Sequence, residues 1–141
     1  MIIRLTETSP YLDKLQQYFT EVFTKENVKE DIKNNKFTNY FTYIIDDNPI
    51  AFINYYIMYE RAELININVL DSFQNQKVAS KLLEYMINDC IKNSVTSITL
   101  EVKSTNVKAI HLYEKFGFKE IGTRKGYYQG IDGILMEKEL M

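Results

Sequence analysis

The chain has 141 residues, of which 45% are apolar and 26% charged, as expected for one globular domain. Its formal net charge of -2 excludes a general electrostatic attraction to nucleic acid. No stretch has the length and apolarity of a signal peptide or a membrane span, and the single cysteine, Cys90, excludes a disulfide framework. We therefore expect a single domain over residues 1–141, located in the cytoplasm, with no membrane or nucleic-acid partner.

The first half of the chain predicts a short strand, two helices and an antiparallel run of three strands. After a strand at Ile2 to Leu5, Ser9 and Pro10 suit the N-cap and the first position of a helix. Apolar residues continue at helical spacing to Phe23, and a second helix is expected over Val28–Asn34. Aromatic and β-branched residues then predict three strands over 40–45, 50–59 and 62–70, with a turn at 46–49 between the first two.

The second half of the chain alternates helices and strands. It predicts an amphipathic helix from Val78 to Ile91, a strand over 97–104, a helix over 107–116 and two strands over 118–124 and 131–139. The element order is β-α-α-β-β-β-α-β-α-β-β. This order predicts an α/β (α+β) domain with a mixed central sheet of about seven strands and about four flanking helices.

The glycines are unevenly placed. All of them lie in the last quarter of the chain, at Gly117, Gly122, Gly126, Gly130 and Gly133. This excludes a Walker-type or dinucleotide-type glycine loop in the first 116 residues. An anion could instead bind at residues 71–80, where a strand runs into a helix N-terminus with unpaired amides. The alternative is an ordinary turn with solvated lysines at Lys77 and Lys81.

Three segments of the second half resemble one known family. They are AELININV with FQNQKVASKLL, then ITLEVKSTNVKAIHLYEKFGF, and finally GTRKGYY. The first is similar to the strand and pyrophosphate-binding loop of the GCN5-related N-acetyltransferases (GNAT). The other two resemble the L-E-V…N-x-x-A-x-x-L-Y-E-x-x-G-F and R-x-x-Y-Y patterns of the branch that acetylates the N-terminal alanine of a ribosomal protein. Together they span roughly Ala62 to Tyr128, and the resemblance implies a GNAT fold.

The resemblance also implies a site for acetyl-CoA as co-substrate. The loop, entered at Gln74, would bind the pyrophosphate, and backbone N–H groups at the end of the preceding strand would polarise the thioester oxygen. Asn106 would contact the cofactor arm, and it also suits an ordinary helix N-cap, which is a compatible role. The implied cofactor-binding residues are Ile67, Asn68, Val69, Gln74, Asn75, Gln76, Lys77, Val78, Ala79, Ser80 and Asn106.

Lys77 departs from the family pattern, because it stands at the middle glycine of the loop. Lysine fits there if its backbone is helical, since only a positive φ favours glycine. Its ammonium group would also offset phosphate charge. We therefore expect Lys77 to weaken or alter the binding of acetyl-CoA without abolishing it.

The resemblance assigns catalytic roles to Glu101 and Tyr113. Glu101 would be the general base for the attacking amine, directly or through water, and Tyr113 would protonate the departing thiolate. The alternatives are a solvent-facing strand carboxylate and a core aromatic. Asn66, Tyr127 and Tyr128 would contact the acceptor, although the tyrosines also suit a strand edge. The lone His111 and Cys90 suit structural roles, and no His, Cys or Asp cluster has the spacing of a metal site.

The acceptor amine is the least determined part of the function. Freeing an α-amine of pKa about 7.8 costs about 3.5 kcal/mol less at neutral pH than freeing a lysine of pKa about 10.4. A single glutamate of pKa about 4.3 therefore suits a protein N-terminus, such as that of a ribosomal protein, better than a lysine. A small amine (a polyamine, amino acid or drug) and a non-catalytic CoA-binding module remain the alternatives. A monomer and a homodimer are both compatible with the sequence.

Overall fold

The computed structural model describes residues 1–140 and contains one seven-stranded sheet in the order β1-β2-β3-β4-β5-β7-β6. The predicted order of helices and strands, and the predicted fold class, are confirmed. The elements are β1 (Ile2–Arg4), α1 (Leu12–Tyr18), α2 (Lys25–Asn34), β2 (Thr38–Ile45), β3 (Asn48–Met58), β4 (Arg61–Val69), η1 (Asp71–Phe73), α3 (Val78–Lys92), β5 (Ser97–Lys103), α4 (Val107–Lys115), β6 (Lys119–Tyr128) and β7 (Ile131–Glu139).

The start of the first helix differs from the prediction. The Ser9 Oγ accepts a hydrogen bond from the Thr6 N–H at 2.8 Å, so it closes a turn before the helix instead of capping it. Helix α1 begins at Leu12 and ends at Tyr18, and the expected stripe as far as Phe23 continues in a turn. A side chain that can bond to several nearby amides does not by itself determine where a helix begins.

The three strands of the first half form the expected antiparallel meander. Asp46 and Asp47 have φ values of 49° and 63°, which make a tight two-residue turn between β2 and β3. A turn of this kind matches the right-handed twist of the two strands that it joins. The turn is therefore shorter than the predicted 46–49, and β3 begins at Asn48.

Strand β4 contains a β-bulge that changes which residues face each side of the sheet. Tyr55 pairs with Leu64 and Asn54 pairs with Asn66, so Ile65 is an extra residue on β4. Before the bulge, the even-numbered residues face α3. After the bulge, the odd-numbered residues Ile67 and Val69 face α3. The bulge therefore turns the two asparagines of β4 toward the opposite face.

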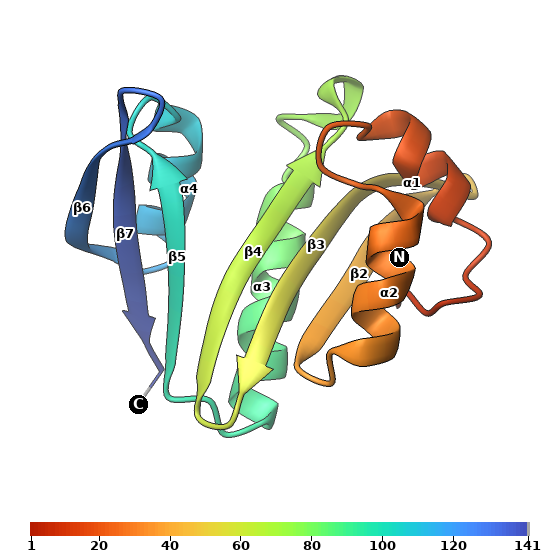
Figure 1. Ribbon diagram of the computed structural model, residues 1–141, viewed down its shortest axis with the longest axis horizontal. Coiled ribbons are helices and arrows are strands. Elements are labelled where there is room, and N and C mark those ends of the chain that lie inside the picture. Colours follow the sequence, from red (N-terminus) through yellow and green to blue (C-terminus); the bar gives the residue numbers. More distant parts are fainter. Residues whose placement is uncertain (141) are drawn as a thin grey trace.

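The sheet buries a separate apolar core on each face. Helices α1 and α2 cover one face and α3 and α4 the other (Figure 1). Cys90 of α3 is fully buried in the larger core, as its place in the apolar stripe predicts. Phe23 and Phe52 pack edge to face in the smaller core, with ring centroids 5.1 Å apart. No helix within residues 1–140 is long and apolar enough to cross a membrane.

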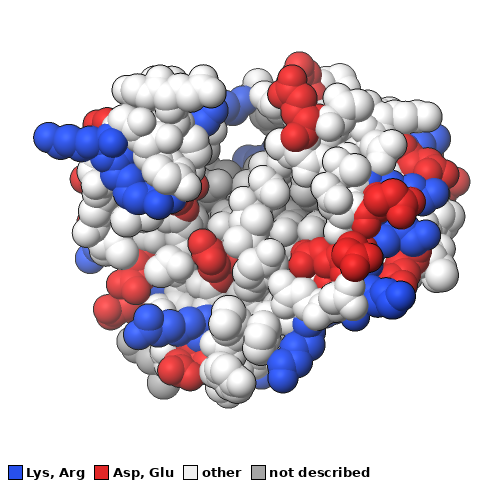
Figure 2. Space-filling model, in the orientation of Figure 1, with Lys and Arg blue, Asp and Glu red and all other residues white. Residues whose placement is uncertain are grey.

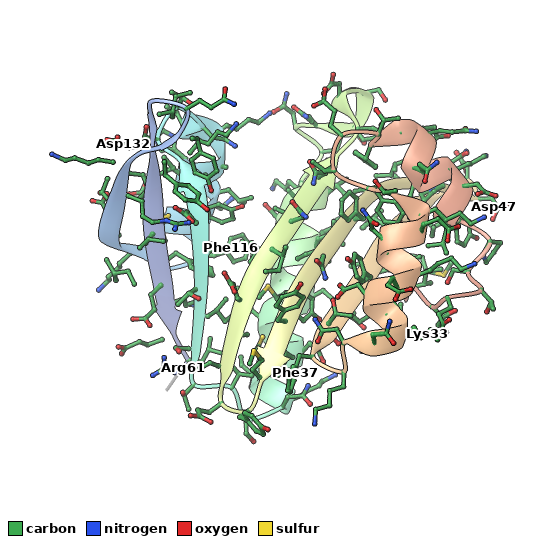
Figure 3. All side chains as sticks on the ribbon, in the orientation of Figure 1. Lys33, Phe37, Asp47, Arg61, Phe116 and Asp132 are labelled. Carbon is green, nitrogen blue, oxygen red and sulfur yellow. The ribbon has the colours of Figure 1, made fainter. Side chains whose placement is uncertain are left out.

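Strands β4 and β5 are neighbours for only part of their length. Within residues 1–140 they are the one parallel pair, and their register covers only three partners, from Arg61 with Ser97 to Glu63 with Thr99. Beyond these pairs the two strands diverge, as Figure 1 shows. Arg61 lies at the paired end and Asp132 on the far side of the open end (Figure 3). This gap divides the sheet into two halves and leaves backbone groups of β4 without a strand partner.

Candidate functional site

The open part of β4 presents free backbone groups to the gap. The Leu70 N–H donates to the Ile50 carbonyl oxygen of β3 at 2.9 Å. Because bonded and outward-pointing residues alternate along an antiparallel ladder, Asn68 also faces β3 with its backbone. The N–H groups of Ile67 and Val69 therefore point into the gap, where they can donate to a bound oxygen.

A cleft of about 420 Å³ opens at this place, between the end of β4, the N-terminus of α3 and helix α4. Figure 2 shows the surface hollowed at the open end of the gap. The lining residues are Ile67, Val69, Phe73, Gln74, Asn75, Lys77, Val78, Ala79, Ser80, Asn106, Lys108, Ala109, Leu112 and Tyr113.

The loop before α3 supplies most of the polar groups of the cleft. Within the described residues, none of the backbone N–H groups of 75–80 donates a hydrogen bond, and no side chain caps α3. The positive end of the helix dipole lies at the same place. A helix N-terminus with free amides is a site for an anion such as a phosphate group.

Lys77 has φ 63° and ψ 21°, which is the left-handed conformation. This corrects the sequence-based expectation, in which lysine was acceptable at the glycine position because its backbone would be helical. The left-handed conformation costs an L-residue with a Cβ roughly 1 kcal/mol more than glycine. Asn75 is also left-handed, with φ 67°, so the loop retains the backbone shape that glycine would favour.

Gln74 of the loop contacts both α4 and the end of β4. The Lys108 Nζ donates to the Gln74 Oε1 at 3.3 Å, and the Gln74 Nε2 donates to the Val69 carbonyl oxygen at 3.3 Å. The Asn106 Oδ1 accepts from the Ala109 N–H at 3.2 Å and caps α4. Asn106 is thus an N-cap that also lines the cleft.

Tyr113 lies at the inner wall of the cleft and is 6% exposed. Its ring packs edge to face against Phe118, with centroids 5.9 Å apart. Burial raises the pKa of the Tyr113 hydroxyl to about 12, because a phenolate would lose its hydration there. None of the described residues hydrogen-bonds this hydroxyl, which is therefore available to a ligand.

Glu101 lies on the other face of β5. Its neighbours Leu100 and Val102 are buried on the α4 side, so the carboxylate projects away from the cleft toward the opposite face. There it forms a bidentate ion pair with Arg124 of β6, with Nε to Oε2 at 2.8 Å and Nη2 to Oε1 at 2.6 Å. The guanidinium group lowers the pKa of the Glu101 carboxyl, because it favours the charged form.

A glycine of β7 makes room for this ion pair. A Cβ on Gly133 would overlap the Glu101 Oε2 and would lie 3.0 Å from the Tyr128 ring. The Arg124 guanidinium in turn lies 3.5 Å from the centre of the Tyr127 ring. Gly133 lies inside β7, where it pairs with Arg124 of β6.

The comparisons with known proteins agree with this geometry. The sequence profile of the acetyltransferase (GNAT) family matches residues 8–118. The chain belongs to this family. The crystal structure of the ribosomal-protein-S18-alanine N-acetyltransferase from Escherichia coli is similar, with a TM-score of 0.85 and 26% identity over 99% of this chain and 94% of that one.

Two relatives give the level of sequence similarity within the family. Over 83 residues the chain is 39% identical to the ribosomal protein bS18-alanine N-acetyltransferase of E. coli K12, covering 59% of this chain and 56% of that protein. It is 37% identical to an N-alpha-acetyltransferase of Saccharolobus solfataricus, covering 57% of this chain and 49% of that protein. The chain thus aligns over about half the length of these relatives.

The GNAT fold separates the predicted site residues into two groups. Most of the predicted cofactor-binding residues line the cleft together with Tyr113, whereas Asn68 and Gln76 are not among the lining residues. The other group, which is Asn66, Glu101, Tyr127 and Tyr128, does not line the cleft. By strand register, Glu101 and Asn66 share the face opposite α3 and α4. The strand pairing between the faces that carry these two groups ends early, after Glu63 with Thr99.

Four lining residues were not predicted, namely Phe73, Lys108, Ala109 and Leu112. Three of them belong to α4, where Ala109 and Leu112 follow Asn106 at the helical spacing of three residues. That spacing is a signal that could have identified them, but it also fits core packing. The exposed His111 does not line the cleft, and within residues 1–140 no three His, Cys, Asp or Glu side chains are arranged to hold a metal ion.

A substitution at Gly133 tests the packing around Glu101. Gly133→Ala is expected to lower the free energy of unfolding by about 1–3 kcal/mol, because the new methyl group displaces the carboxylate. It should also return the Glu101 carboxyl pKa toward about 4.3, since the ion pair with Arg124 is lost. Chemical denaturation and ¹³C NMR titration measure the two effects.

The matched control is Gly122→Ala on β6. A Cβ there would lie 3.5 Å from the Leu135 Cδ1, which is an ordinary contact. Gly122→Ala should leave the Glu101 pKa unchanged. Equal effects of the two substitutions on that pKa would contradict the packing described for Gly133.

Proposed function

We propose that this protein is an acetyl-CoA-dependent N-acetyltransferase that acts on a protein N-terminal α-amine. The observation that carries the proposal is the gap between β4 and β5, with free strand amides on one side and an uncapped helix N-terminus at its end. Membership of the GNAT family supports it. Acetyl-CoA supplies the acetyl thioester. The protein binds and orients acetyl-CoA and the acceptor amine, and its side chains exchange protons with them.

The cleft has N–H donors for two parts of acetyl-CoA, the anionic pyrophosphate and the neutral thioester. We assign the pyrophosphate to the free amides of residues 75–80, with Lys77 and Lys108 adding positive charge at the lining. We assign the thioester oxygen to the outward N–H groups of Ile67 and Val69. Donors fixed on a strand stabilise negative charge on that oxygen without having to reorganise.

Glu101 is proposed to take the proton that the acceptor ammonium loses before its nitrogen attacks. As the new N–C bond forms and the C–S bond breaks, the sulfur departs as a thiolate, and the second proton lost by the nitrogen passes through solvent water to that thiolate, giving the free thiol of CoA. The lowered pKa of Glu101 makes it a weak base. A weak base suits an α-amine of pKa about 7.8 better than a lysine of pKa about 10.4.

Tyr113 is proposed to stabilise the departing sulfur. With a pKa of about 12 its hydroxyl is protonated at neutral pH and can donate a hydrogen bond. Complete transfer of that proton to a thiolate is uphill, because an ordinary thiol has a pKa of about 8.5. Tyr113 therefore acts as a hydrogen-bond donor to the departing thiolate, and the proton that neutralises the sulfur is the second one lost by the acceptor nitrogen.

The acceptor is proposed to enter on the face that carries Asn66, Glu101, Tyr127 and Tyr128. The relatives named above are an alanine N-acetyltransferase of ribosomal protein bS18 and an N-alpha-acetyltransferase. By analogy, we propose an alanine-starting N-terminus of a ribosomal protein as the acceptor and the cytoplasm as the location.

A panel of acceptors tests the proposed function. The protein and acetyl-CoA are incubated with an alanine-starting peptide, with the same peptide blocked at its N-terminus but carrying a lysine, and with a polyamine. Only the first is expected to be acetylated at an appreciable rate, as measured by mass spectrometry. Turnover of the polyamine alone would support a small-molecule acetyltransferase, and binding of acetyl-CoA without any turnover would support a binding module.

Substitutions at Glu101 and Tyr113 test their roles. Glu101→Gln and Tyr113→Phe are each expected to lower kcat/KM for the peptide by about 100-fold, which is typical for the loss of a positioned acid or base. Binding of acetyl-CoA should change little in Glu101→Gln. Glu63→Gln is the control, because it removes an exposed carboxylate from the paired end of β4. Unchanged activity in both variants would contradict the assigned roles.

Lys77 links the loop conformation to the cofactor. Lys77→Gly is expected to raise the free energy of unfolding by up to about 1 kcal/mol, because glycine adopts φ 63° without strain. The Kd for acetyl-CoA should rise about threefold, since one charge near the phosphates is lost. Calorimetric titration and denaturation measure these effects.

Lys77→Asn separates charge from backbone strain, because asparagine tolerates the left-handed region but carries no charge. It should raise the Kd as Lys77→Gly does, with a smaller gain in stability. A Kd that falls about tenfold or more in Lys77→Gly would show that the lysine side chain obstructs the cofactor.

A further inference from the structure

Both oxygens of the Glu101 carboxylate accept a hydrogen bond from the same guanidinium group, that of Arg124. The Arg124 Nε and Nη2 donate to Oε2 and Oε1 at 2.8 and 2.6 Å, which is the strong parallel geometry of guanidinium and carboxylate. An acceptor ammonium that gives its proton to Glu101 needs a place on the same two oxygens. Arg124 and the acceptor therefore compete for one carboxylate.

We propose that Arg124 is a positioning residue that holds Glu101 in the free protein and is displaced from it by the ammonium group of the acceptor. This inference rests on the proposed function, because it concerns the acceptor's place at Glu101. The displacement makes the base strength of Glu101 depend on whether an acceptor is bound. Glu101 is a weaker base while Arg124 is paired with it and a stronger one once Arg124 has left.

The strand that carries Arg124 is built irregularly at this point. The register of β6 with β7 is interrupted between Arg124 and Tyr128, and Gly126 in the interruption has φ 63°. Bulges of this kind change the direction of side chains next to functional sites. The Arg124 side chain is 45% exposed, whereas that of Glu101 is 16% exposed. Release of the guanidinium group therefore moves an already half-hydrated cation into water.

The charged and titratable groups around Glu101 leave Arg124 as its direct counter-ion. Tyr128 packs beside the carboxylate at Gly133, and Tyr127 lies on the outer side of the guanidinium group. The Lys103 Nζ lies over the Tyr128 ring, 5.4 Å from its centre, and forms no ion pair with Glu101. Among residues 1–140, only Arg124 forms a salt bridge with this carboxylate.

The exchange replaces one cation by another, so the charge at Glu101 is preserved. The guanidinium group stays charged at any physiological pH, whereas an α-ammonium of pKa about 7.8 can lose its proton. The Arg124 guanidinium group thus cannot give a proton to Glu101, whereas the α-ammonium of the acceptor can. Arg124 keeps the carboxylate ionised and in place until a group arrives that can react.

The test compares Arg124→Gln with Lys125→Gln, which removes an exposed cation from the next position of the same strand. The acceptor is an alanine-starting peptide with uncharged side chains. Arg124→Gln is expected to raise the Glu101 carboxyl pKa in ¹³C NMR titration, because the guanidinium group that favours the charged form is lost. It should lower the KM for the peptide about threefold, with kcat and the KM for acetyl-CoA little changed. Lys125→Gln should change neither the pKa nor the KM.

A higher or unchanged peptide KM in folded Arg124→Gln would overturn the proposal, because it would make Arg124 an acceptor-binding or a merely structural residue. An unchanged Glu101 pKa would overturn it too. Arg124→Lys keeps the charge but not the bidentate contact, and its peptide KM should lie between those of the wild type and Arg124→Gln. If circular dichroism shows that both Arg124 variants are unfolded, the ion pair is required for folding and the proposal fails.

A separate measurement distinguishes this proposal from the proposed function. If the wild-type protein acetylates no amine, the proposed function fails, and the exchange is then judged with methylammonium as the probe. Methylammonium should shift the Glu101 carboxyl resonance of Arg124→Gln at about threefold lower concentration than that of the wild type. Equal midpoints in the two proteins would overturn the exchange.

Discussion

The early separation of β4 from β5 is the constraint on which the rest of the site depends. A parallel pair that stopped after three partners would be costly in the interior of a sheet, because backbone N–H and C=O groups need partners. Here the unpaired groups border a cleft instead of a neighbouring strand. Helix α3 follows β4 through a short loop, so its free amides lie at the same end of the gap as the free groups of the strand.

The gap also determines how two reactants could meet. Helix α4 and Tyr113 lie behind β5, whereas Glu101 and Arg124 lie in front of it. A continuous sheet would separate these two sets of groups by its whole thickness. Because β4 and β5 diverge, a thioester held from behind and an amine arriving from the front can approach each other through the sheet. One local loss of strand pairing thus opens a passage between the cleft and the face that carries Glu101, the proposed base.

Periodicity and turn chemistry in the sequence were enough for the order of the elements. The loop at the N-terminus of α3 was proposed as a binding loop from the family resemblance, and it lines the cleft. The apolar stripe of α3 and the alternation along β5 reflect which face of each element is buried. This hydrophobic periodicity is the strongest signal of secondary structure in a sequence. The start of α1 was missed, because Ser9 can bond to more than one amide. The left-handed backbone of Lys77 was also missed, because the residue type there argues against it and only the loop geometry requires it.

The Glu101–Arg124 pair was beyond sequence reasoning for a different reason. The two residues are 23 positions apart and meet only because β7 lies between their strands and has a glycine at the crossing point. Each residue alone resembles an exposed charge on a strand. The pairing depends on register and on an empty volume at Gly133, and neither is visible in a single sequence.

The extra residue in β4 has a consequence for how this chain can change in length. Ile65 sets the phase of the strand, so that aliphatic side chains after it face the cleft and Asn66 and Asn68 face the other way. Deleting one residue anywhere between Leu64 and Val69 would exchange these faces, turning the asparagine side chains into the cleft and aliphatic side chains toward the face of Glu101. Insertions and deletions are thus tolerated far less in this strand than in the turns at its ends, even where each single side chain is replaceable.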